Sequence, residues 1–444
     1  MRYILIFLLL SFSLISVHAQ QEMVIAGLVL NSKTSEPIPF ANIGIKGTAI
    51  GTVSNNQGSY ELHLNSGYKR TDSLVVSCVG HGVYSIAISN IRRAKEHIIY
   101  LRPKAYLLNS VTVRPQELSA EDIMEIAIRR ISINYVNKPH LSDGFYREYF
   151  KENGHYAAFA ESAVSIYDAE NYNFQDIKDR ESIKINQLRV SDIYNKGDYV
   201  LYIDLHYALR GNVMRNTAYW KKYIKRAKYK LESLTMDSIS YHGNDLVYCI
   251  SYQMYSKRKG TYNGRFYVRT RDFAILRAEI NAYNRLRGKQ ANGLPQESKT
   301  VMTYKDHRGK LYLSYINASH TVKFKSKKED FNLYFYSELL INNIQTDDFN
   351  PIVEEDAMDT KSIFYQPRYR TYDEDYWKSY NQFENSEAND SIVSDLERYR
   401  PLEKQYMTNG KMKIKPRKTS DKKYEIPVND RTYGIRRKLN TNER

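Results

Sequence analysis

Residues 34–62, TSEPIPFANIGIKGTAIGTVSNNQGSYEL, alternate short apolar runs with tight-turn signals. Prolines restrict φ ahead of the first run, which we expect to be a strand from Phe40 to Ile45. A second run begins at residue 51, and a third follows the turn Asn55–Gly58. Strands of about five residues separated by such turns are typical of a small β-sandwich. No side chain in this stretch is placed for catalysis.

The same pattern continues from residue 22 to residue 103, which holds about seven short apolar runs, the number expected of a sandwich. Glycine adopts positive φ without steric cost and is therefore the usual residue of tight turns. We predict that four glycines are structural turn residues: Gly47, Gly51, Gly58 and Gly80.

Several short motifs in this region resemble the carboxypeptidase-regulatory-like domain. They are Ile25-x-Gly27-x-Val29, Pro37-Ile38-Pro39-Phe40-Ala41-Asn42, Gly47-Thr48, Gly51-Thr52, Gly58-Ser59-Tyr60 and Val76-Ser77-x-Val79-Gly80-His81. The resemblance covers residues 22–103 and implies a seven-stranded transthyretin-like β-sandwich of a kind abundant in exported proteins of Bacteroidetes. His81 departs from the family pattern, which usually has an aromatic residue, most often tyrosine, after the glycine.

The family takes its name from a non-catalytic domain of metallocarboxypeptidases, so the resemblance implies no zinc chemistry. No histidine is followed three residues later by glutamate, and no two histidines are three or four residues apart. Such spacings would place two zinc ligands on one face. Nucleophile-elbow, phosphate-loop, dinucleotide-binding and CxxC motifs are also absent from the sequence. We expect no enzyme, no metal and no cofactor, with a peptidase or glycosidase lacking a recognisable motif as an alternative.

Residues 1–19 are predicted to be a signal peptide, with Arg2, an apolar run and a small-residue cleavage site that ends at Ala19. No later run is long enough for a transmembrane helix. We therefore expect an exported protein in the periplasm, at the outer membrane or outside the cell. Two cysteines, Cys78 and Cys249, lie in apolar runs, and two buried thiols are favoured over a disulfide.

The formal net charge is +16. Export makes a nucleic-acid partner implausible, so none is expected. Part of the excess lies in residues 411–444, which hold twelve Lys and Arg residues against four acidic residues. This segment is a solvated tail or contacts a polyanion at a membrane periphery.

The fold class predicted for the whole chain is mainly β. The rest of the chain holds long β runs with turn signals between them. The alternation of strands and turns in residues 263–279 resembles the curved sheets of periplasmic lipoprotein carriers. The sandwich is therefore followed by a larger curved antiparallel sheet with one or two packing helices. The predicted segments are a linker strand (104–118), a helix capped by Ser119 (119–138), the antiparallel β domain (143–350), an acidic and aromatic arm (351–400) and a basic, loosely ordered tail (401–444).

Four residues are candidates for facing a ligand or partner. Glu161 lies within an apolar strand, so it either pairs with a cation on a neighbouring strand or lines a cavity. Trp220 and Tyr223 lie on one side of an amphipathic helix that packs on the core or contacts an anionic surface. Trp377 belongs to the aromatic arm.

These features predict a non-catalytic cell-envelope protein. Its sandwich is an interaction or spacer module, and its sheet, in a chain with 40 tyrosines, binds a hydrophobic or glycan ligand or a protein partner. The alternative is an accessory or assembly partner of a TonB-dependent outer-membrane transporter. Residues 108–113 resemble the strand that follows this domain in such transporters, and docking would then occur by β-augmentation.

Overall fold

The computed structural model describes residues 23–64, 68–92, 96–106, 118–169, 181–194, 199–200, 205, 209, 211–212, 214–215, 230–256, 260–285, 295–325, 330–358, 372–382, 388–411 and 424–425. The predicted signal peptide lies outside the described residues, as does the predicted helix with Trp220 and Tyr223. No helix within the described part of the chain is long and apolar enough to cross a membrane.

The N-terminal region is the predicted sandwich of seven strands, with a three-stranded sheet (β4-β1-β7) packed on a four-stranded sheet (β3-β2-β5-β6). The strands are β1 (Met23–Asn31), β2 (Asn42–Ile45), β3 (Gly51–Val53), β4 (Ser59–Leu64), β5 (Ser73–Ser77), β6 (Tyr84–Ala87) and β7 (Ile99–Leu101). Alternate residues of each sheet, such as Val29 and Val76, are buried in a common core.

Three of the four predicted turn glycines have positive φ, namely Gly47 (80°), Gly58 (75°) and Gly80 (88°). Gly51 is different, because it begins strand β3 and its φ is not positive. A Cβ atom at Gly51 would lie 2.7 Å from the carbonyl oxygen of Ile43. Glycine is needed at this position because strands β2 and β3 approach each other too closely for a side chain. The prediction of a turn role was therefore wrong for Gly51.

Phe40 does not belong to strand β2, contrary to the prediction from its apolar run, since the strand starts at Asn42. Phe40 has a φ of 60°, which is uncommon for a bulky residue and costs roughly 1–3 kcal/mol. Its ring leaves the sandwich and stacks on Tyr315 of the large sheet, with centroids 5.2 Å apart. The motif phenylalanine is thus an inter-sheet contact.

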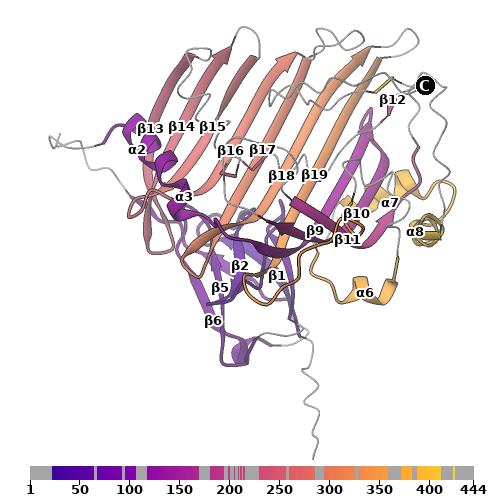
Figure 1. The fold of residues 1–444 in the computed structure, drawn as a ribbon, viewed down its shortest axis with the longest axis horizontal. Coiled ribbons are helices and arrows are strands. Elements are labelled where there is room, and N and C mark those ends of the chain that lie inside the picture. The colour runs from indigo at the N-terminus through magenta and orange to yellow at the C-terminus, as the bar shows by residue number, and fades with distance from the viewer. Residues whose placement is uncertain are drawn as a thin grey trace, which may run out of the picture.

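The large sheet is antiparallel and has eleven strands in the order β11-β10-β9-β19-β18-β17-β16-β15-β14-β13-β8 (Figure 1). Its strands are β8 (Ala105–Tyr106), β9 (His140–Glu152), β10 (His155–Asp168), β11 (Glu181–Val190), β13 (Lys230–His242), β14 (Asp245–Ser256), β15 (Gly260–Arg269), β16 (Ile275–Arg285), β17 (Pro295–His307), β18 (Lys310–Lys325) and β19 (Asp330–Gln345). A separate parallel pair joins β12 (Tyr199–Val200) to β20 (Tyr424–Glu425).

Strand order in this sheet departs from sequence order at two places, because β8 pairs with β13 and β9 pairs with β19. Strands β13 to β19 form a meander, whereas β9, the first long strand, pairs with β19, the last. In Figure 1, β9, β10 and β11 are turned relative to β13–β19, as expected of a twisted sheet.

The described helices are α2 (Ala120–Arg129), α3 (Ile131–Asn134), α6 (Glu374–Lys378), α7 (Ala388–Leu396) and α8 (Leu402–Lys411). Ser119 and Asp122 form the predicted capping box of α2. The single helix predicted over 119–138 is broken at Arg130 and ends at Asn134. The tail predicted from residue 401 instead starts with helix α8, whose Leu402 packs in a cluster with Phe159 of β10.

The two faces of the large sheet have different coverings. Tyr146 of β9 shares a core with Ile123 of helix α2, whereas its neighbour Phe145 packs with Val53 of the sandwich and Trp377 of α6. Successive side chains of a strand point to opposite faces. Helix α2 therefore packs on part of one face, and the sandwich and C-terminal arm cover part of the other.

Candidate functional site

An uncovered part of the sandwich-side face carries a cross-strand row of aromatic and polar side chains. Tyr255 of β14 lies opposite Thr261 of β15, which lies opposite Tyr283 of β16. The two tyrosines are 46% and 43% exposed. One step along the strands, Asn281 donates a 3.0 Å hydrogen bond to Asn263. We call these five residues the open tyrosine row.

The opposite side of the same strands is buried, with Met254, Tyr262 and Ala282 in the helix-side core. This alternation with a period of two is the signal that predicts a half-exposed strand. It could have been read from the sequence, but the open tyrosine row was not singled out there.

Glu161 and Trp377 meet in a buried charge cluster whose charged side chains come from four strands, β9, β10, β11 and β19. Arg147 of β9 donates to Glu161 of β10 at 2.6 Å and to Glu338 of β19 at 3.1 Å. Arg189 of β11 also donates to Glu161, and its guanidinium lies 4.4 Å from the ring centroid of Trp377. Pairing with neighbouring-strand cations was one of the two predictions for Glu161, and it is confirmed.

The two carboxylates of this charge cluster differ in their pKa. Burial acts to raise the pKa of Glu161, but Arg189 and Arg147 outweigh it and hold the pKa below its usual value. Burial dominates at Glu338 and raises its pKa, even though Tyr315 and Tyr336 each donate a 3.0 Å hydrogen bond. The cluster is covered by α6, so it anchors the arm to the sheet.

The sandwich is joined to the large sheet through the β13–β14 hairpin and through a buried lysine. Gly80 donates a backbone hydrogen bond of 2.7 Å to Tyr241. Lys305 of β17 donates to the carbonyl of Ala49 in the sandwich at 2.8 Å and to that of Ile341 at 3.1 Å. Burial lowers the pKa of Lys305 to about 7.

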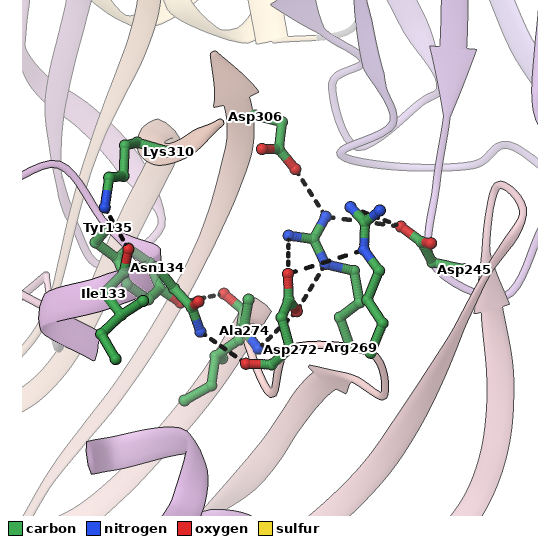
Figure 2. Close-up of polar contacts among 11 residues, drawn as sticks. Ile133, Asn134, Tyr135, Asp245, Arg269, Asp272, Ala274, Asp306 and Lys310 are labelled. Atoms are coloured by element: carbon green, nitrogen blue, oxygen red, sulfur yellow. Dashed lines mark hydrogen bonds and ion pairs between the residues drawn. The ribbon is translucent and has the colours of Figure 1, made fainter. Parts of the chain in front are cut away.

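Close to this hairpin, Arg269 is surrounded by aspartates (Figure 2). It donates two hydrogen bonds of 3.0 and 2.8 Å to Asp272 and one of 2.7 Å to Asp306, and Asp245 lies 3.6 Å away. We call Arg269 and these three aspartates the arginine node. Asn134 of α3 donates to the backbone carbonyl of Asp272 at 3.0 Å, so the arginine node also fixes the position of helix α3. Despite burial, these aspartates raise the pKa of Arg269.

A cavity of about 220 Å³ lies between the sandwich and the large sheet. The family motif Pro37–Pro39 lines one side, and Val79 and His81 line another. Tyr267 of β15 and Arg277 of β16 line it from the large sheet. His81, the departure from the family pattern, is thus a cavity residue.

Arg277 has few partners in this cavity. Its Nε donates to Glu279 at 2.8 Å, and its guanidinium lies 5.5 Å from the Phe40 ring and 5.8 Å from the Tyr267 ring. No acceptor within the described residues contacts its two terminal nitrogens. Its side chain is 15% exposed, so these two nitrogens have only limited access to water.

Both cysteines are buried and unpaired, as predicted. Cys78 lines the cavity, and burial raises the pKa of its thiol. Activated cysteines show the opposite shift. Across the described ranges, no group of three His, Cys, Asp or Glu residues is arranged to hold a metal ion.

Comparison with solved structures finds remote likenesses. An outer membrane lipoprotein-sorting protein domain from Vibrio parahaemolyticus is 11% identical, with 53% of this chain and 96% of that chain covered and a TM-score of 0.26. A LolA superfamily protein from Nitrosomonas europaea is 12% identical, with 53% of this chain and 96% of that chain covered and a TM-score of 0.20. A chain of the MucA/MucB complex of Pseudomonas aeruginosa is 7% identical, with 52% of this chain and 99% of that chain covered and a TM-score of 0.17. Scores this low carry no argument about fold or function.

No curated protein matches the chain. A family model does match its N-terminal part. Residues 25–113 match the CarboxypepD_reg-like domain, which confirms the resemblance predicted from the sandwich motifs.

Proposed function

We propose that the protein is an exported, non-catalytic cell-envelope protein that binds a glycan on the open tyrosine row of its large sheet. The single observation that carries this proposal is the row itself. Tyr255 and Tyr283 offer exposed rings on either side of Thr261, and the amides of Asn263 and Asn281 lie alongside. Aromatic rings pack on the apolar faces of sugars, and a few placed polar groups set orientation.

The polarity of the row favours a glycan over a purely hydrophobic ligand. Apolar ligands need a concave apolar surface, and the apolar side chains on the other face of these strands, such as Met254 and Tyr262, are already buried in the core. The sandwich, held at the β13–β14 hairpin and by Phe40, would then set the orientation of the row relative to the envelope.

The test is binding of envelope glycans to immobilised protein. Tyr283→Ala and Tyr255→Ala should each weaken binding about five- to tenfold, since the loss of one ring contact costs about 1–1.4 kcal/mol. Tyr100→Ala is the matched control, because Tyr100 is a 53% exposed tyrosine on strand β7 of the sandwich. Equal binding by all three variants, or no glycan retained by the wild type, would contradict the proposal.

A second candidate function, docking to an outer-membrane transporter, is favoured by exposed apolar side chains on the sandwich. Val24, Ile98 and Tyr100 are 42%, 44% and 53% exposed, and Tyr100 lies beside Leu30 across the β1–β7 pair. Exposed apolar side chains that gather on one surface are typical of protein interfaces, and we expect these three to contribute to one. Val24→Lys should reduce recovery of a transporter from envelope extracts, while Tyr283→Ala should not. Unchanged recovery with Val24→Lys would remove this candidate.

A further inference from the structure

The cavity between the sandwich and the large sheet is separate from the open tyrosine row. We propose that this cavity binds a small zwitterion of the amino-acid class, with its carboxylate at Arg277 and its ammonium at Glu36. Both residues line the cavity, one from β16 and the other from the turn after β1.

The cavity has two groups that can donate hydrogen bonds to a carboxylate. The terminal nitrogens of Arg277 have no acceptor among the described residues, and a guanidinium binds a carboxylate through two parallel hydrogen bonds. Asn31 is the second donor. Its Oδ1 accepts from the backbone of Lys33 at 2.9 Å and of Thr34 at 3.4 Å, which orients its Nδ2 away from these amides.

Two other groups can accept hydrogen bonds from an ammonium. Glu36 uses one carboxylate oxygen to accept from Thr34 Oγ1 at 2.9 Å, and its second oxygen has no partner in the described part of the chain. His81 also lines the cavity, and its Nδ1 lies 3.3 Å from the carbonyl oxygen of Val79. With Nδ1–H donating there, Nε2 is left as an acceptor.

Charge distinguishes a zwitterion from a simple anion. An anion at Arg277 would be repelled by two carboxylates, that of Glu279, 2.8 Å from Arg277 Nε, and that of Glu36 on the cavity wall. Like charges about 4 Å apart repel by roughly 4 kcal/mol near a protein surface, and by less at longer range. A zwitterion avoids much of this repulsion, because its ammonium pairs with Glu36. Pro37, Ile38 and Pro39 supply an apolar side for the ligand's side chain.

The volume of the cavity suits a small ligand. A cavity of about 220 Å³ is equivalent to roughly seven water molecules at about 30 Å³ each. It is smaller than the usual pocket for a drug-sized ligand, about 300–1,000 Å³. A free amino acid fits this volume.

Isothermal titration of the full mature chain with a panel of free amino acids tests the proposal. For the best ligand, the N-acetyl form lacks the ammonium and the amide form lacks the carboxylate. We expect each modified form to bind at least tenfold more weakly than the parent. Absence of binding by every free amino acid at millimolar concentration would overturn the proposal, as would equal affinity of the N-acetyl form.

Variants identify the site. Arg277→Gln and Glu36→Gln should each weaken binding at least tenfold, whereas Arg129→Gln, which changes an exposed arginine on helix α2, should have no effect. Glu36 is exposed, so its variant decides the matter if Arg277→Gln does not fold. Tyr283→Ala should leave this affinity unchanged, which separates this site from the glycan proposal. Wild-type affinity in Glu36→Gln would overturn the assignment.

Discussion

Two arginines near the junction of sandwich and sheet have opposite surroundings. Arg269 has three aspartates around it and is 7% exposed, whereas Arg277 has one hydrogen bond to Glu279 and is 15% exposed. Arg269 directs its hydrogen bonds and ion pairs to the β13–β14 hairpin and the turn at residues 270–274, which in turn contacts helix α3. Arg277 retains two terminal nitrogens beside a cavity. Burial of a cation therefore does not by itself indicate a binding site, whereas donors without an acceptor make Arg277 a candidate.

The most demanding check on this comparison is a third case, the charge cluster at Glu161. Glu161→Gln should lower the free energy of unfolding by about 3–5 kcal/mol, because it leaves the buried charges of Arg147 and Arg189 without their shared carboxylate. Urea unfolding measures this loss. Glu125→Gln, on the exposed surface of α2, should change the free energy of unfolding by less than about 0.5 kcal/mol. A similar small change for Glu161→Gln would contradict the role given to the cluster.

Arg269→Met should have the next largest effect, a loss of about 2–3 kcal/mol in the free energy of unfolding. The loss is smaller because the orphaned Asp272 and Asp306 are 26% and 46% exposed and regain water. Hydrogen exchange should increase in the turn at residues 270–274 and in α3. An unchanged exchange rate there would show that the arginine node does not hold the helix.

Lys305 gives a prediction about pH. Its pKa falls from 10.5 to about 7 on folding, so between these values the unfolded chain binds more protons than the folded chain. Stability therefore rises with pH in this window, and below pH 7 the cost of burying the lysine is constant. The expected gain from pH 7 to pH 9 is about 2 kcal/mol as an upper value. Lys305→Met should lose this part of the pH dependence, and retention of the full slope in the variant would exclude Lys305 as its source.

Arg277→Gln should have the smallest effect on folding, below about 1 kcal/mol, since only one charged hydrogen bond of a partly exposed pair is removed. Urea unfolding of this variant beside Arg269→Met gives the comparison directly. Equal losses in the two variants would mean that Arg277 is structural in the same sense as Arg269.

The sandwich could be predicted from sequence because local chemistry determines it. Gly47, Gly58 and Gly80 adopt the backbone conformation that their turns require. The capping box at Ser119 was equally local. Strand β11 was not predicted, since Glu181–Val190 mixes polar residues into its pattern, and helix α8 was missed because its composition is polar.

The candidate sites depend on contacts that local patterns do not contain. The need for a partner at Glu161 followed from its apolar surroundings, but the identity of Arg147 and Arg189 depended on strand order. The cavity required residues 36–39 to meet Arg277, about 240 positions later. His81 was noticed as a departure from its family, and only the fold gave that departure a place beside the cavity.

The pairing of β9 with β19 has a consequence for the order of synthesis. Residues 140–152 leave the ribosome early, but their hydrogen-bonding partner at 330–345 follows almost two hundred residues later. Until then β9 presents an unpaired edge, and chains with such distant pairings fold slowly and are prone to aggregate. A nascent chain of this protein must therefore be protected from aggregation until strand β19 has been synthesised.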